Sequence, residues 1–214
     1  MPLKHKKQAP PHDENIIFFY MPDAERGELC QWYPSTFSVS KSTIASLVSY
    51  SDDEPTTSTD PQPADDELIT FTCAEQFMMY CKAARFHDIA AQRKIMATTD
   101  PKAQKSIGKT ITGFYDASWD EVKSDVVVAG NMAKFGQNSK LKAKLLNTGE
   151  KMLVEAASKD RVWGIGFNAN QALHHRDQWG ENRLGKALML VRGRLREQET
   201  GSQEEGKKAV SVGM

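Results

Sequence analysis

The sequence predicts an α+β fold that is mainly helical, with a few short strands, in a single domain. Three observations lead to this prediction. Helical periodicity covers much of the chain from Glu75 onward, whereas only short runs are rich in β-branched and aromatic residues. A length of 214 residues, 39% of them hydrophobic, is enough to build one core.

Short strands are predicted at three places, where aliphatic and aromatic residues are bounded by polar or turn-forming ones. Between the first two, residues 22–37 contain Pro22, Gly27 and Pro34, which predict a loop or a strand with turns. The order of the strands in a sheet does not follow from the sequence. The predicted strands are Ile16–Tyr20, Leu68–Thr72 and Met152–Ala156.

Six helices are predicted from periodicity and from start and stop signals. Asp100 is a good N-cap with Pro101 at the first helical position, and Ser118 with Glu121 three residues later matches a capping box. Gly149 closes the fifth helix. The predicted helices cover residues 75–86, 87–97, 101–108, 118–137, 138–147 and 184–197.

Three segments are predicted to lie outside the ordered domain. Residues 1–14 and 199–214 are polar tails, and residues 49–67 consist almost entirely of acids, Ser, Thr and Pro. Such a composition buries too little apolar surface to offset the entropy of ordering. The domain is therefore expected to span residues 15–198, with a disordered acidic insertion at about 49–67.

Charge and cysteine usage narrow the class of protein. The 28 basic and 28 acidic residues balance, which argues against a globally basic nucleic-acid binder. No apolar run is long enough to span a bilayer, and no apolar stretch follows the basic N-terminus as in a secretory signal. Cys30, Cys73 and Cys81 form no CxxC pair and are predicted to be reduced thiols, with Cys73 and Cys81 buried beside an apolar helix. We expect a cytoplasmic protein, with the basic N-terminus leaving a nuclear location open.

Glu75 is the leading catalytic candidate. It opens a helix whose other early residues are apolar, so it either only complements the helix dipole or points into a cleft where it activates water. Lys82 lies two helical turns further on and shares its face. A carboxylate and an ammonium on one face suit a phosphorylated substrate, and they equally suit a surface helix.

Residues 160–185 form a long predicted loop that is rich in Gly, Asn and Trp. Gly164 and Gly166 let the backbone approach a ligand closely, while Trp163 either stacks on a planar base or anchors the loop to the core. The adjacent His174 and His175 lack partners at metal-ligand spacing, which favours solvated histidines over a metal site.

Trp119 and Lys123 are four residues apart and therefore share one face of the predicted helix 118–137. Trp119 serves either as a core anchor or as a stacking wall with a cation beside it. These three regions, in this order, carry a resemblance to a known family.

The chain resembles the YbiA-like, or NADAR, superfamily from IIFFY to LMLVRGRLRE. The family's Gly-x-x-Ser-Asn-Phe element corresponds to residues 27–32, its acid-led helix to AEQFMMYCKAARF, and its Gly-Arg to Gly108-Lys109. The remaining elements are the Trp-x-x-Val-Lys helix at 119–123, Lys-Phe-x-Gln at 134–137, Asp-x-x-Trp-Gly-x-Gly at 160–166 and Asn-x-Leu-Gly at 182–185.

The resemblance implies an N-glycosidase without metal or cofactor. Its substrates would be phosphorylated ribosylamino-pyrimidine intermediates of riboflavin biosynthesis, cleaved with release of ribose 5-phosphate. It implies Glu75 and Asp160 as catalytic residues. The implied substrate-binding residues are Gln31, Trp32, Lys82, Lys109, Trp119, Lys123, Trp163, Gly164, Gly166 and Asn182.

Two departures bear on the substrate. Gln31 replaces the family's Asn and reaches one methylene further, and Lys109 replaces its Arg and loses a bidentate phosphate contact. Three alternatives stay open: hydrolysis of an ADP-ribosylated base such as guanine, in which nucleic acid enters only as the modified substrate; non-enzymatic binding of NAD or ADP-ribose; and an interaction protein that recruits partners through its acidic insertion.

Overall fold

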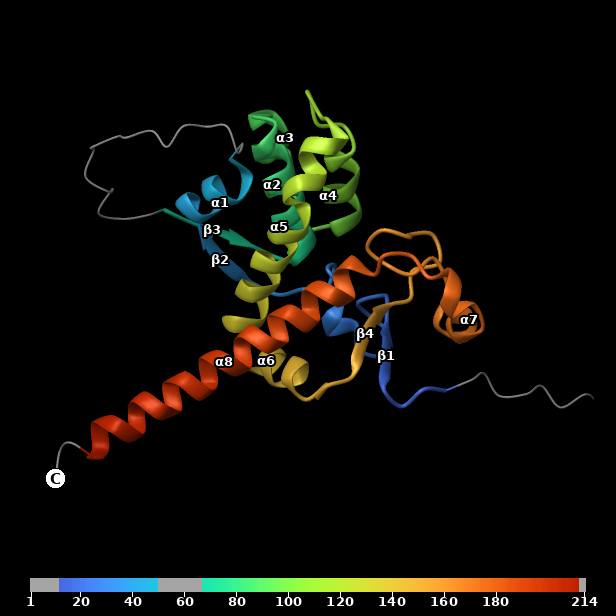
Figure 1. The fold of residues 1–214 in the computed structure, drawn as a ribbon. Helices are drawn as coiled ribbons and strands as arrows, with labels where there is room; N and C mark the ends of the chain where they lie inside the picture. Colours follow the sequence, from blue (N-terminus) through green and yellow to red (C-terminus); the bar gives the residue numbers. More distant parts are fainter. Residues whose placement is uncertain (1–11, 50–66, 212–214) are drawn as a thin grey trace, which may run out of the picture.

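The structure is a computed structural model that describes residues 12–49 and 67–211. Most of the predicted N-terminal tail, nearly all of the predicted insertion and the last three residues lie outside the described residues. Figure 1 shows a mainly helical molecule with two small sheets. The prediction of an α+β, predominantly helical fold is confirmed.

Within the described residues, four short strands form two separate pairs. β1 (Ile16–Phe19) pairs in parallel with β4 (Met152–Glu155), and β2 (Phe37–Ser40) pairs antiparallel with β3 (Leu68–Phe71). The three predicted strands are confirmed within one residue. β2 was not predicted, because it emerges from a stretch in which proline and glycine obscure the strand pattern.

From residue 74 onward the helices follow the predicted order, except that a short helix and a 3-10 turn at residues 169–178 interrupt the predicted loop 160–185. A helix before that point, α1, was not predicted; Ser40 caps it by accepting from the backbone N–H of Thr43 at 3.2 Å. The helices are α1 (Lys41–Val48), α2 (Ala74–Arg85), α3 (Ile89–Met96), α4 (Pro101–Gly108), α5 (Asp116–Gly136), α6 (Ser139–Leu146), α7 (Ala169–Ala172) and α8 (Arg183–Ser211), with 3-10 turns η1 (Gly27–Leu29) and η2 (Leu173–Gln178).

Two of the predicted helix boundaries are wrong. The helix predicted at residues 118–137 is α5, which begins at Asp116 with Tyr115 in the N-cap position, so Ser118 is not a cap. Its hydroxyl instead accepts a hydrogen bond at 3.0 Å from Nε of the buried Arg85, which needs acceptors. The last helix continues past Glu197 to Ser211, because Gln, Glu, Lys and Ala dominate that stretch and favour helix.

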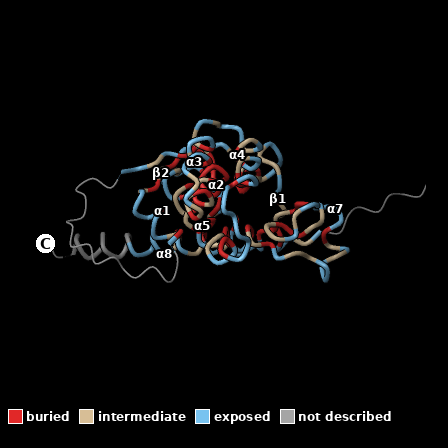
Figure 2. The backbone as a smooth tube through the Cα atoms, turned by 90° about the horizontal axis from the view of Figure 1, so that it is seen from above, coloured by how far each residue is buried: buried red, intermediate tan, exposed pale blue. Residues whose placement is uncertain are grey.

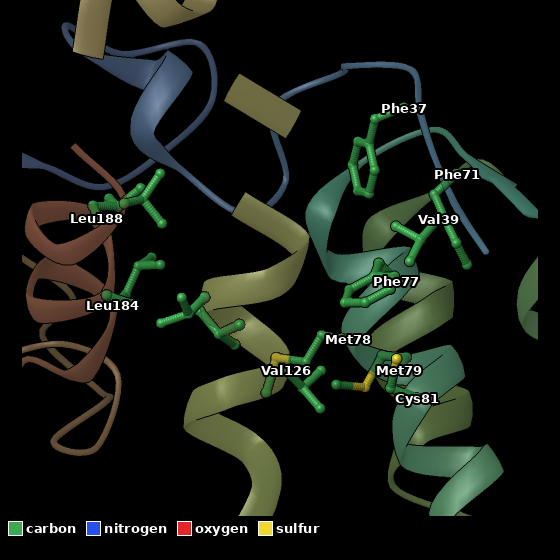
Figure 3. Close-up of a cluster of buried hydrophobic side chains, with 14 of the residues drawn as sticks. Phe37, Val39, Phe71, Phe77, Met78, Met79, Cys81, Val126, Leu184 and Leu188 are labelled. Carbon is green, nitrogen blue, oxygen red and sulfur yellow. The ribbon is translucent and has the colours of Figure 1, made fainter. Parts of the chain in front are cut away.

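The core is centred on α2, which is buried on almost every side (Figure 2). α1, α3, α4 and α5 all pack against it. Gly130 allows α5 to approach closely, since a Cβ there would lie 2.6 Å from the ring of Phe77. In Figure 3 the rings of Phe37, Phe71 and Phe77 gather beside α2; Phe71 and Phe77 meet edge to face, with centroids 5.1 Å apart.

The β1–β4 pair lies at the other end of the molecule, beside α8 (Figure 1). A second, smaller apolar cluster of Ile16, Val154, Ile165 and Ala172 holds this pair against the segment after β4. The end of β4 and the loop that follows, together with the N-terminal end of α2, line the cavity described below.

Candidate active site

A cavity of about 480 Å³ lies between the helical core and the segment after β4. α2, α4 and α5 form one wall, and the end of β4 with residues 157–163 forms the opposite one. Residues 30–32 complete the lining. A cavity of this size suits a small organic substrate.

The cavity brings together most of the residues predicted for the site. The predicted residues that line it are Gln31, Trp32, Glu75, Lys82, Lys109, Trp119, Lys123, Asp160 and Trp163. Gly164, Gly166 and Asn182 lie outside the lining. Four further charged residues, which the sequence did not single out, are Lys105, Asp116, Glu155 and Lys159.

Glu75 lies in the first turn of α2 and is only 5% exposed. Its backbone N–H donates to the carbonyl of Gln31 at 3.1 Å, which fixes the start of the helix against the lining. Burial raises the pKa of Glu75 to about 7, although Lys105 and a hydrogen bond from the Trp32 side chain both lower it. Between the two interpretations of Glu75, the structure favours a carboxyl that faces a cavity.

Glu155, the last residue of β4, is another acidic group of the cavity. Its Oε2 atom is completely buried and has no hydrogen-bond partner within the described residues. Burial, assisted by Asp160 and Glu75, raises the pKa of Glu155 to about 8, and Lys105 opposes the shift. An acid inside an otherwise apolar strand, MLVEAA, is the signal in the sequence that could have identified it.

The backbone of Glu155 is fixed from two sides. Its N–H donates to Oδ1 of Asn182 at 3.0 Å, and its carbonyl accepts from the N–H of Ile165 at 3.0 Å. Asn182 Nδ2 also donates to the carbonyl of Leu153 at 2.9 Å, so this side chain holds β4 rather than lining the cavity. A Cβ on Gly164 would lie 2.8 Å from the Glu155 carbonyl, which explains the need for glycine there.

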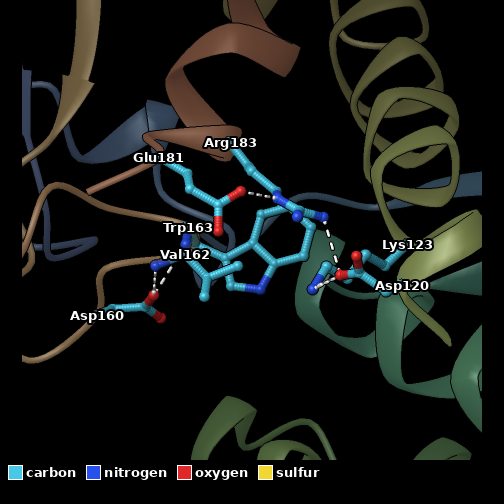
Figure 4. Close-up of polar contacts among 7 residues, drawn as sticks. All are labelled: Asp120, Lys123, Asp160, Val162, Trp163, Glu181 and Arg183. Carbon is cyan, nitrogen blue, oxygen red and sulfur yellow. Dashed lines mark hydrogen bonds and ion pairs between the residues drawn. The ribbon is translucent and has the colours of Figure 1, made fainter. Parts of the chain in front are cut away.

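Asp160 shapes the turn that follows β4. Its Oδ1 accepts from the backbone N–H of Val162 at 2.9 Å and of Trp163 at 2.8 Å. Figure 4 shows these two bonds, with the Trp163 indole lying between this turn and α5. Trp163 also packs against the main core, so it both anchors the turn and lines the cavity.

The lysines of the cavity fall into two groups, according to whether the structure gives the ammonium group a partner within the protein. The first group is Lys82 and Lys123. Lys82 Nζ donates to the carbonyl of Gly108 at 2.8 Å and lies 3.8 Å from the centroid of the Phe114 ring; burial lowers its pKa. Lys123 pairs with Asp120, which also contacts Arg183 at 3.1 Å (Figure 4). The second group is Lys105, Lys109 and Lys159, for which no acidic partner is found among the described residues.

Buried polar contacts hold residues 30–32 in place. Gln31 Oε1 accepts from Nδ2 of the fully buried Asn131 at 2.9 Å. Nζ of Lys134, also fully buried, donates to the carbonyl of Cys30 at 2.9 Å, and burial lowers the pKa of Lys134 to about 8. Gln31 is therefore tied to the scaffold, and Trp32 beside it is positioned over Lys105, whose Nζ lies 5.9 Å from its ring centroid.

The other groups considered in the sequence have structural roles. Cys30, Cys73 and Cys81 are all free and buried, and burial raises the pKa of each thiol. The ring of His175 stacks on Phe167 with centroids 4.7 Å apart. Across residues 12–49 and 67–211, no cluster of three or more His, Cys, Asp and Glu side chains suits a metal ion. No described helix is long and apolar enough to cross a membrane.

Comparison with known proteins extends this picture. The chain is 41% identical over 129 residues to an N-glycosidase of Acanthamoeba polyphaga mimivirus, covering 59% of this chain and 76% of that protein. It is 27% identical over 184 residues to a riboflavin biosynthesis protein of Vibrio vulnificus, covering 86% of this chain and 40% of that protein. The fold matches the NMR structure of the Escherichia coli protein YbiA with a TM-score of 0.61 at 22% identity, over 94% of this chain and 96% of that one.

The family model of the NADAR domain matches residues 18–196. That range begins in β1 and ends within α8, so it includes every element that lines the cavity. The resemblance predicted from the sequence motifs is confirmed: the chain belongs to the NADAR domain family.

Proposed function

We propose that this protein is an N-glycosidase that hydrolyses the bond between a ribose phosphate and an amino-pyrimidine base, releasing ribose 5-phosphate. The observation that carries the proposal is the buried Glu75 carboxyl, whose pKa of about 7 leaves it able to exchange a proton near neutral pH. The names of two relatives, an N-glycosidase and a riboflavin biosynthesis protein, support the reaction class and the kind of substrate.

The chemistry of the lining fits each part of such a substrate. Hydrolysis of an N-glycoside develops positive charge on the ribose, by analogy with other glycosidases, and a carboxylate stabilises that charge. Glu75 would also accept a proton from the attacking water. The lysines without acidic partners would bind the phosphate, and Trp32 and Trp163 offer flat surfaces for the base.

Glu75→Gln tests the central role of this carboxyl. The substitution keeps the size of the side chain and removes its charge and basicity. We expect the wild-type protein to release ribose 5-phosphate from a ribosylamino-pyrimidine phosphate, and the variant to bind the same compound with turnover lower by at least about 100-fold. Turnover by the variant at the wild-type rate would show that Glu75 is not the base.

A second candidate function is hydrolysis of an ADP-ribosylated base. The positions of three lysines in the cavity lining favour this substrate, because it carries two phosphates. Lys105 lies on α4 and Lys109 directly follows that helix, whereas Lys159 follows β4, so the lining offers cations from two separate segments for the two phosphates of ADP-ribose. Release of ADP-ribose from ADP-ribosyl-guanosine, compared with release of ribose 5-phosphate from the pyrimidine compound, distinguishes the two. Saturable binding of both with no product would support a non-enzymatic binder instead.

A further inference from the structure

Glu155 has a buried oxygen that the fold leaves without a partner. Oε2 is shielded from solvent and accepts no hydrogen bond from the described residues, while the side chain lines the cavity. An unpaired buried carboxylate oxygen costs stability, so such a group calls for an explanation. A protonated carboxyl that donates to a bound substrate would satisfy it.

The backbone contacts of Glu155 hold this residue in a fixed position. Both its N–H and its carbonyl are used, by Asn182 and Ile165, at 3.0 Å each. Parallel pairing with β1 places Phe19 opposite Glu155 in the register. Glu155 therefore lines the cavity from a fixed strand end, as a group that acts on a substrate requires.

Glu75 and Glu155 form a pair of carboxyls with different surroundings. Glu75 comes from the first turn of α2 and has a Trp32 contact and a helix N-terminus, both of which favour its charged form. Glu155 comes from the opposite wall and has no such donor at Oε2. When two carboxyls repel each other, the proton resides preferentially on the one with fewer donors.

We propose that Glu155 is a second catalytic residue, which protonates the departing amino-pyrimidine nitrogen while Glu75 receives a proton from water. This inference rests on the proposed N-glycosidase function. The C1′–N bond breaks and its electron pair passes to the nitrogen, which takes the proton of Glu155. The water oxygen bonds to C1′, and the water proton passes to Glu75. The products are an amine and ribose 5-phosphate; proton transfer from Glu75 back to Glu155 through solvent restores both groups.

Asp160, the other acidic lining residue of the segment that follows β4, is the alternative proton donor. Its Oδ1 already accepts two backbone hydrogen bonds that define the turn at Val162 and Trp163. Glu155 has no comparable structural task for its side chain within the described residues. The choice of Glu155 over Asp160 follows from this difference in contacts.

The experiment compares two leaving groups. A ribosylamino-pyrimidine phosphate needs a proton on its nitrogen to depart, whereas 4-nitrophenyl riboside 5-phosphate releases a stable phenolate without one. We expect Glu155→Gln to lower kcat on the pyrimidine compound by about 100- to 10,000-fold and to lower kcat on the nitrophenyl compound by less than about 5-fold. Glu150→Gln, an exposed acid just before β4, is the matched control and should cleave both at the wild-type rate.

The pH profile adds a readout that a structural role would not change. The charged groups facing Glu155 are Glu75, Asp160 and Lys105, and the pKa of Glu155 is raised to about 8. Wild-type kcat on the pyrimidine compound should therefore fall as the pH rises through about 8, because the proton donor is lost. This alkaline limb should be absent from the residual activity of Glu155→Gln.

Each remaining outcome has a clear meaning. Loss of activity on both compounds to the same extent, or retention of both, would overturn the proton-donor role of Glu155. A wild-type protein that cleaves neither compound contradicts the proposed function, and the role of Glu155 then fails with it. Thermal melting of Glu155→Gln within a few degrees of wild type shows that the comparison is made on folded protein.

Discussion

Oδ1 of Asn182 accepts the backbone N–H of Glu155 at 3.0 Å, although the two residues are 27 positions apart in the chain. Nδ2 of the same side chain donates to the carbonyl of Leu153 at 2.9 Å. One asparagine thus satisfies two backbone groups of β4. Among the described strands only β1 pairs with β4, so no strand occupies the edge that Asn182 contacts. The start of α8 and the acidic wall of the cavity are therefore mechanically coupled.

Replacing Asn182 should weaken both stability and catalysis. Asn182→Ala leaves a buried N–H and a buried carbonyl without partners, and it strains a backbone with φ of 52°, which asparagine tolerates better than alanine. We expect a loss of about 2–4 kcal/mol in the free energy of unfolding, measured by urea titration. Turnover should fall as well, because Glu155 is no longer held.

Asn182→Gly separates the cost of backbone strain from the cost of the two lost hydrogen bonds. Glycine adopts the same φ without strain but cannot make either hydrogen bond. Its unfolding free energy should exceed that of Asn182→Ala by about 1 kcal/mol, with a similar loss of turnover. Equal urea midpoints for wild type and Asn182→Ala would show that the two hydrogen bonds contribute nothing.

The activity should have a bell-shaped dependence on pH. Glu75 must be deprotonated to accept a proton, so activity rises through its pKa of about 7; Glu155 must be protonated to donate one, so activity falls through its pKa of about 8. The two groups interact, so the limbs report the pair as a whole. A kcat profile from pH 5 to 10 should peak between the two values. A flat profile across that range would contradict the assignment of both carboxyls.

Stability should depend on pH with the opposite sign from that of a salt-bridged acid. The pKa of Glu75 is raised in the folded protein, so the folded state binds its proton more tightly than the unfolded chain does. Stability is therefore lost as the pH rises from about 4.5 towards 7. Glu75→Gln removes this loss and should be more stable than wild type by about 1–3 kcal/mol at pH 8, with little difference at pH 4. Urea titrations at the two pH values measure it; an equal difference at both would contradict the buried, titrating carboxyl.

Arg85 is predicted to be a major determinant of stability. It is 1% exposed, donates to the carbonyls of Val48 and Ser49 at the end of α1, and pairs with Glu121 at 2.8 Å. Arg85→Met removes these bonds and leaves the buried carbonyl of Val48 without this donor, so we expect a loss of about 3–5 kcal/mol. Glu121→Gln is the control: its side chain is 63% exposed, and its loss should cost less than about 1 kcal/mol. Chemical unfolding of the two variants side by side provides the comparison.

The sequence predicted the elements better than the site. Local signals are strong for α2 to α6, since periodicity and caps depend on neighbouring residues, and the family motifs predicted nine side chains of the lining. Lys105 could not be distinguished from any exposed helical lysine, because only the approach of α4 to Trp32 gives it a role. Ser118 matched a capping box, yet the tertiary contact with Arg85 prevailed over that local pattern. Properties that arise from contacts between distant segments were thus the ones missed.

Lys105 is predicted to influence both Glu75 and Glu155, because it interacts electrostatically with each carboxyl group. It lowers the pKa of Glu75 and of Glu155 and lines the cavity without an acidic partner among the described residues. Lys105→Ala should therefore shift both limbs of the pH profile to higher pH and raise KM for a phosphorylated substrate about 10-fold or more. Lys102→Ala, on the same helix but outside the lining, is the matched control and should leave KM and both limbs unchanged. If Lys105→Ala raises KM while the limbs stay in place, Lys105 binds phosphate without tuning the acids; if neither changes, it has no role in the site.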